Sequence, residues 1–274
     1  MTRPSALRSP WLWLCCVVAL VYAFILSPIL ITALVSFNGS NRSSFPPQGF
    51  SLRWWGEAFA PKWWDPLVFS VYQAALSALV ATLFGSMLAF AVVRYRFWGR
   101  EFLMALSAGP IILPALITGI GILQLLLALG LGDLVGLPGI VIGHAVVCLP
   151  FVMRTTTISL ATMPVNVERA ATSLGARPWT VLTKVTLPLA KDGIFAGATF
   201  SFIQAFSDYS IALFLSSAEA KPIPIVILNY IEFGFSPTIA AVAILTMIVP
   251  LCLIFIMQRF FRIGDYVTSG GTHG

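Results

Sequence analysis

Long apolar runs, separated by short polar segments, occupy most of this chain of 274 residues. A bilayer core of about 30 Å is crossed by roughly 20 helical residues, and six of the runs reach that length. They cover about 11–37, 67–93, 102–129, 138–160, 193–216 and 238–260. Strands of a membrane barrel would alternate apolar and polar positions and be about half as long. The pattern predicts an all-α, polytopic membrane protein with six transmembrane helices.

The composition supports this class, because 58% of the residues are hydrophobic and only 9% are charged. A water-soluble domain carries roughly a quarter charged residues. The first apolar run follows Arg3 and Arg8, but it is longer than the apolar part of a signal peptide and lacks a clear cleavage site. We therefore expect an uncleaved anchor helix.

The positions of lysine and arginine predict the orientation of the spans. Twelve of the sixteen lie at the termini, between the second and third runs, or on and beside the segment between the fourth and fifth runs. The other four are Arg42, Arg53, Lys62 and Lys221. By the positive-inside rule, both termini and the loop at about 161–191 are predicted to be cytoplasmic. The net charge of +6 is then a topology signal, and nucleic-acid binding is not expected because the charges are divided among loops.

The chain offers little catalytic or metal-binding chemistry. All four cysteines fall in predicted spans without CxxC or Cys/His spacing, so we expect neither disulfides nor a metal site. His144, the only histidine besides His273, has no evident nucleophile partner and is expected to be a hydrogen-bonded residue between helices. No GxxxxGK[ST] loop occurs. We predict no catalytic residues, and any nucleotide energy must come through another chain.

Prolines and glycines within two runs predict interrupted helices. Pro110 and Pro114 stand in the third run and Pro150 in the fourth. Interrupted helices expose backbone groups that line a path, or that neighbouring side chains satisfy.

A polar and basic segment, Glu168 to Pro188, stands out between the fourth and fifth runs and reads ERAATSLGARPWTVLTKVTLP. Ala170 and Ala171 favour a short helix, whereas Gly175 permits a positive φ and Pro178 cannot donate a helical hydrogen bond. The segment therefore predicts a helix, a bend and a second helix.

The second helix carries Trp179, Leu182 and Val185 at three-residue spacing, which gives it one apolar stripe. Pro188 is predicted to end it just before the fifth span. The stripe either packs on the ends of the chain's own helices or anchors a partner protein through Trp179.

These residues resemble the EAA loop of ABC-importer permeases, whose pattern is EAA, three residues, Gly, nine residues, Ile, one residue, Leu-Pro. The matching positions are Ala170, Ala171, Gly175, Val185, Leu187 and Pro188. Arg169 stands at the glutamate position, and Glu168 lies one residue earlier. In the family this glutamate is thought to seat the loop in the ATPase. The resemblance thus implies that its role passes to Glu168, or that the contact is charge-reversed.

The resemblance extends along the chain, including LPALITGIGIL, HAVVCLPFVMRTTT and LNYIEFGFSPTIAA, and points to the second permease subunit of spermidine/putrescine-type importers. It implies a type I ABC-importer fold and a single permease domain, 1–274, in a bacterial inner membrane. It also implies a homologous permease partner, two ATPase subunits that bind the ATP, and an extracytoplasmic solute-binding protein. The implied ATPase-coupling residues are Glu168, Arg169, Ala170, Ala171, Gly175, Pro178, Trp179, Leu187 and Pro188.

The segment at about 38–66 is predicted to be an outer amphipathic stretch. Its aromatics, Trp54, Trp55, Trp63 and Trp64, are expected to lie among lipid headgroups. Docking of the binding protein is the alternative role.

Asp208 lies inside the fifth run, where an unpaired charge is costly. Ser201, Gln204 and Asp208 share one helix face, which we expect to line the translocation path. A hydrogen bond between helices is the alternative role for Asp208. Polyamine permeases often carry two adjacent acids here, whereas this chain has Ser207 before Asp208.

These features favour a polyamine or related amine as the solute. The alternative is the same role for another solute, such as an aminophosphonate, sulfate or other anion, an amino acid or an opine, because fold does not define cargo. A second class is an ion-coupled secondary transporter with Asp208 as its cation site, which the coupling loop disfavours.

Overall fold

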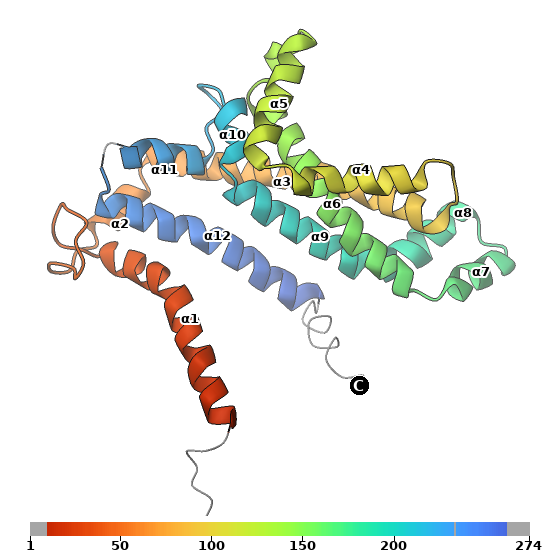
Figure 1. The fold of residues 1–274 in the computed structure, drawn as a ribbon, viewed down its shortest axis with the longest axis horizontal. Helices are drawn as coiled ribbons and strands as arrows, with labels where there is room; N and C mark the ends of the chain where they lie inside the picture. Colours follow the sequence, from red (N-terminus) through yellow and green to blue (C-terminus); the bar gives the residue numbers. More distant parts are fainter. Residues whose placement is uncertain (1–9, 233, 262–274) are drawn as a thin grey trace, which may run out of the picture. The chain divides into compact units, whose positions relative to one another are not determined.

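The computed structural model describes residues 10–232 and 234–261, without the side chains at 10, 106–108, 110–112, 165, 260 and 261. The elements are α1 (Pro10–Val35), α2 (Arg53–Ala58), α3 (Pro61–Arg94), α4 (Arg100–Ile112), α5 (Ala115–Ala128), η2 (Gly132–Leu134), α6 (Leu137–Thr162), α7 (Val165–Ser173), α8 (Pro178–Val181), η3 (Leu182–Thr186), α9 (Leu187–Ser207), α10 (Ser210–Leu215), α11 (Ile223–Glu232) and α12 (Pro237–Phe261) (Figure 1). In these residues the β structure is one isolated bridge, between Asn38 and Phe50. The all-α prediction is confirmed.

Four helices of the described chain are long and apolar enough to cross a membrane, namely α1, α3, α6 and α12. The third predicted span is divided at Leu113–Pro114, where Leu113 is extended because a proline follows it. The fifth is divided between α9 and α10, at Asp208 and Tyr209. Six uninterrupted spans are therefore not confirmed. Pro150, by contrast, lies within α6 without ending it.

The chain forms two compact units: Met1–Trp63 with Asn229–Met247, and Trp64–Leu228 with Ile248–Gly274. In the first, the Asn38 side chain organises the segment after α1, donating to the Arg42 carbonyl (2.9 Å) and accepting from the Gln48 amide (2.9 Å). Trp54 donates to the Asn38 carbonyl at 2.6 Å. The Asn38 side chain bonds to backbone N–H and C=O groups of this segment, so these groups have partners although the segment is not a helix or strand.

The tryptophans of this outer segment differ from the sequence expectation. Trp54 and Trp63 are buried, with 7% and 2% of their surface exposed, and the Trp63 ring packs on Tyr230 at 4.4 Å. Trp64 remains 42% exposed. Protein thus covers two rings that the sequence assigned to lipid headgroups, because the segment folds back on α11 and α12 rather than forming one amphipathic helix.

The second unit is built around α6, which packs against α3, α4, α5, α9 and α10. Its contact with α9 is antiparallel, since Cys148 meets Ser201 while Val152 meets Gly197. The closeness of these helices depends on Gly197, because a Cβ there would lie 2.8 Å from the Val152 Cα. Small residues let membrane helices approach closely and gain dispersion energy.

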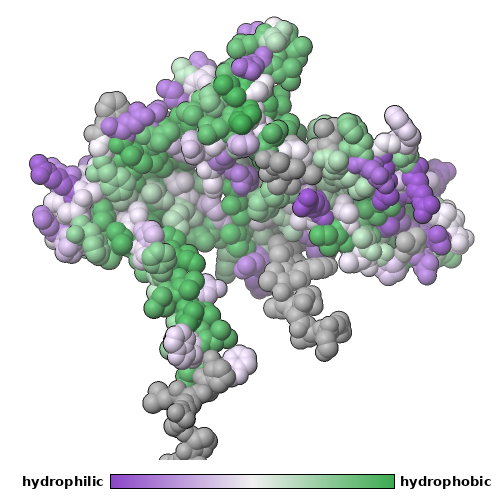
Figure 2. All heavy atoms as spheres, in the orientation of Figure 1, coloured by the Kyte–Doolittle hydropathy of each residue, from purple (hydrophilic) through white to green (hydrophobic). Residues whose placement is uncertain are grey.

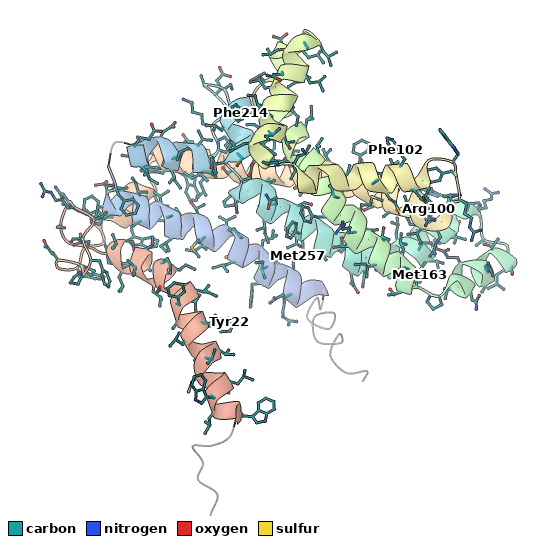
Figure 3. All side chains as sticks on the ribbon, viewed as in Figure 1. Tyr22, Arg100, Phe102, Met163, Phe214 and Met257 are labelled. Carbon is teal, nitrogen blue, oxygen red and sulfur yellow. The ribbon has the colours of Figure 1, made fainter. Side chains whose placement is uncertain are left out.

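One end of this unit is closed by contacts among α3, α4 and α6. Arg100, at the start of α4, donates to the Val92 carbonyl at 2.8 Å and holds the connection from α3 (Figure 3). Met163, directly after α6, is buried with Val92 and Ala190 (Figure 3).

The surface separates apolar from polar residues. Apolar side chains cover α1, whose most apolar stretch contains no buried residue, whereas hydrophilic residues gather over α7 and α8 (Figure 2). An apolar helix without protein cover needs a lipid or protein environment. The α7–α8 segment suits water or a soluble partner.

Candidate functional site

The loop at Glu168–Pro188 begins with α7, and its bend follows from Gly175. Gly175 has φ +85°, a value that favours glycine. Its amide bonds to the Thr172 carbonyl (2.9 Å), and the Ala176 amide bonds to the Ala171 carbonyl (3.1 Å). This pair of bonds is a Schellman motif, which closes a helix end. The predicted helix, bend and second helix are confirmed.

The prediction that Pro188 ends the second helix is wrong. α8 continues through the π-helical turn η3 into α9, with Pro188 in the first turn of α9. The Thr186 hydroxyl also lies 3.3 Å from the Val181 carbonyl, five residues back. Proline has no backbone N–H to donate. A π-turn already interrupts the regular i→i−4 hydrogen bonds of the helix, so the missing donor of Pro188 does not end it.

Glu168 joins three segments in a cluster that we call the clamp, made of Arg94, Glu168 and Thr186. The Arg94 Nε lies 3.0 Å from Glu168 Oε2, and the Arg94 Nη2 donates to Oε1 at 3.2 Å. Thr186 donates to the same Oε1 at 2.8 Å. The two charged side chains are only 16% and 17% exposed. Because charge-assisted bonds are strong, the clamp fixes α7 to the end of α3 and to η3.

A groove of about 900 Å³ lies beside the clamp. Its walls include Tyr95 after α3, Arg169 and Thr172 of α7, and Trp179 of α8. Trp179 is 73% exposed and Leu174, at the end of α7, is 89% exposed. Arg169 is also exposed. α7 and α8 therefore present apolar and cationic groups together. The two helices lie at the end of the second unit where α6 ends (Figure 1).

Ser201, Gln204 and Asp208 follow one side of α9, but their surroundings differ. Ser201 is fully buried, Gln204 is partly exposed, and the Asp208 side chain is 10% exposed. Asp208 Oδ2 accepts the Ile211 amide at 3.0 Å, and so caps the start of α10. The same oxygen lies 3.4 Å from His144 Nε2. Asp208 thus holds the break between α9 and α10 against α6.

A polar layer surrounds this break inside the second unit. Gln73 of α3 donates to the Ala205 carbonyl at 2.8 Å, and the Cys148 thiol lies 3.6 Å from the Ser201 carbonyl. Within the described residues, Gln73 Oε1, His144 Nδ1 and Ser201 Oγ have no hydrogen-bond partner. Polar groups without partners are costly inside an apolar bundle, so this layer is unlike the rest of the packing.

Comparison with known proteins decides what this arrangement is. Residues 81–262, which include the clamp, the groove and the polar layer except Gln73, match the family of binding-protein-dependent transport system inner membrane components. The chain belongs to this family.

Two relatives support the assignment over most of the permease chain. This chain is 31% identical over 252 residues to the spermidine/putrescine transport system permease protein PotC of Escherichia coli (strain K12), and the match covers 88% of this chain and 91% of the relative. It is 30% identical over 253 residues to the putrescine transport system permease protein PotI of the same organism, covering 89% and 88%.

A crystal structure of a bacterial ABC transporter involved in the import of the acidic polysaccharide alginate has the same fold. The TM-score is 0.72 at 22% identity, over 95% of this chain and all of that one.

Membership of the family defines the activity at a coarse level. A permease of this kind is a membrane-spanning subunit of an ABC importer in the inner membrane. It has no ATPase of its own, so ATP hydrolysis comes from a partner subunit, and a binding protein delivers the solute.

The structure also joins residues that the sequence left separate. Arg94 entered the sequence argument only as a topology charge, and Thr186 had no role, yet both bind Glu168. His144 was expected between helices, but its contact with Asp208 was not anticipated. The only signal for that contact was that both are ionisable residues inside predicted spans.

Proposed function

We propose that this permease carries a small polyamine, such as spermidine or putrescine, or a related amine. The observation that carries the proposal is the likeness to two permeases named for these solutes over nearly the whole chain. Asp208 supports it further, because a carboxylate attracts a cationic solute.

A thermal-shift and radiolabel screen of the binding protein that works with this permease tests the solute. The panel contains spermidine, putrescine, an aminophosphonate, sulfate and amino acids. Binding of spermidine or putrescine would support the proposal. Binding of an anion alone would discard the polyamine assignment and leave the permease assignment intact.

For the assembly, the proposal includes a homologous partner permease, two ATPase subunits and cytoplasmic termini. The loop at Glu168–Pro188 is its ATPase-coupling segment, with Trp179 and Arg169 on the exposed side and the clamp on the inner side. An ion-coupled transporter would need no ATPase. Uptake that persists without any ATPase subunit would therefore argue for that second class.

Gly175→Asp is expected to abolish uptake while leaving membrane insertion intact. A Cβ at φ +85° is strained, and the carboxylate would lie at the bend of the coupling segment. Uptake in proteoliposomes and the amount of inserted subunit are the measurements. Because no atom lies within 4 Å of a Cβ built there, a packing defect is not the expected cause. Wild-type uptake would remove the coupling role from this bend.

For the translocation path, we propose the polar side of α9, with Gln204 and Asp208 next to the path and Ser201 buried beneath them. Asp208→Asn is expected to lower uptake of a cationic solute by about tenfold, since a hydrogen bond to a charged group contributes ~1.5–3 kcal/mol. Asparagine still caps helices well, so α10 and assembly of the complex should be preserved.

The matched control for this variant is Ser201→Ala, which removes a buried hydroxyl that has no partner in the described chain. Uptake and recovery of the assembled complex are measured for both. Equal losses of uptake and assembly in Asp208→Asn would make Asp208 a packing residue rather than part of the path.

A further inference from the structure

Glu168 and Arg169 are adjacent in α7, yet only one of them is available to a partner. The Glu168 carboxylate is 17% exposed and is held by Arg94 at 3.0 Å and by Thr186 at 2.8 Å. Both of its oxygens are occupied by groups of the same chain. Removing it from this environment would leave Arg94, itself 16% exposed, without its counter-ion.

Arg169 has the opposite character. Its side chain is exposed on the wall of the groove, and it forms no ion pair within residues 10–232 and 234–261. The Arg94 and Glu168 charges compensate each other across the clamp, so Arg169 leaves the groove with a positive charge. Arg177 and Lys184, which are exposed in the same segment, have the same sign.

Trp179 also lines the groove, with 73% of its surface exposed. An arginine beside an exposed tryptophan is a common composition for the centre of a protein interface. Interfaces place charges of opposite sign opposite one another, and a like charge would be repelled. The groove therefore suits a partner surface that offers an apolar contact for Trp179 and a carboxylate for Arg169.

We propose that Arg169 pairs with an aspartate or glutamate of the ATPase subunit, so that this permease docks on an acidic surface while Glu168 stays within its own chain. The inference rests on the proposed coupling function. The inference assigns a negative charge to the partner surface, because Glu168, the acid next to Arg169, is already bound within the permease.

The test is capture of the purified ATPase subunit by the whole permease complex, together with ATP-driven uptake. Arg169→Glu is expected to weaken capture by about tenfold or more, since like charges across an interface repel. Arg169→Lys keeps the charge and should retain most of the capture. Arg96→Glu is the matched control, because Arg96 is exposed outside the coupling segment and does not line the groove. Its capture should stay near wild type.

Charge pairing predicts two further results. Raising the salt concentration should reduce the difference between wild type and Arg169→Glu, because exposed charges are screened. An acid-to-lysine change on the ATPase docking surface should restore capture by Arg169→Glu. If no such change restores it, the acidic partner is wrong. Size-exclusion profiles of each permease variant keep a folding defect distinct from a docking defect.

A Trp179→Ala arm separates this inference from the coupling function on which it rests. If Trp179→Ala loses capture while Arg169→Glu keeps it, the charge proposal is overturned and the coupling function stands. If neither variant changes capture or uptake, both are overturned. If Arg169→Glu changes only the binding of anionic lipid vesicles, the groove faces the membrane surface and the acidic ATPase contact is rejected.

Discussion

Gly197→Val is expected to eliminate most of the folded permease. A Cβ at this position would lie 2.6 Å from Thr155 Oγ1, 2.8 Å from the Val152 Cα and 3.3 Å from the Val152 Cβ. The second of these atoms is backbone, so no side-chain rotation relieves the overlap and α6 must move away from α9. Overpacking costs ~1–3 kcal/mol where side chains can adjust, and more is expected here. The measurement is the yield of monodisperse protein after detergent extraction, together with its thermal midpoint.

Gly121→Val is the matched control, because it makes the same change inside helix α5, where no atom lies within 4 Å of the added Cβ. Its yield and thermal midpoint should stay near wild type. Equal losses in the two variants would mean that valine in a membrane helix, and not the contact between α6 and α9, causes the defect. The α6–α9 contact would then contribute little to stability.

Local chemistry explains which parts of the loop could be predicted from sequence. Gly175 and Pro178 act on their own backbone, and a Schellman motif needs only a helix end followed by a residue that accepts a positive φ. Helix, bend and second helix were therefore predictable. Pro188 was misjudged because the turn before it is π-helical, and Thr186 of that turn is bound to Glu168, 18 residues away in the chain. No local pattern encodes that contact.

The polar layer shows the same limit on a larger scale. The sequence placed Ser201, Gln204 and Asp208 on one helix face, which requires only the helical period. Whether that face meets solute or protein depends on the register of α9 against α6. That register brings His144 to 3.4 Å from Asp208 and buries Ser201. The division of the fifth span had a local signal, since aspartate is a favoured helix cap, but the run at 193–216 is apolar enough as a whole to be taken for one span.

Arg94→Glu is expected to abolish coupled uptake by releasing α7 from α3. The substitution places two carboxylates where an ion pair now stands at 3.0 Å, and Thr186 cannot neutralise both. Breaking a mostly buried ion pair by removing one partner costs ~3–5 kcal/mol of stability. This is more than a single hydrogen bond from the Thr186 hydroxyl contributes. The permease should still insert, because the buried contacts of α6 with α9 lie elsewhere. The expected result is ATP hydrolysis without uptake, with faster proteolysis between Glu168 and Pro188.

The reciprocal change tests whether the pairing, rather than either residue alone, is responsible. Arg94→Glu combined with Glu168→Arg restores opposite charges, and the Thr186 hydroxyl can accept from an arginine as readily as it donates to a carboxylate. This double variant should recover a substantial part of the uptake. Arg96→Glu, an exposed arginine two residues beyond α3, is the control for charge reversal in this region. If the double variant is as inactive as Arg94→Glu alone, the pair does not hold the loop. If Arg96→Glu is equally inactive, general charge repulsion accounts for the loss, because among the described residues Arg94 pairs with a carboxylate and Arg96 does not.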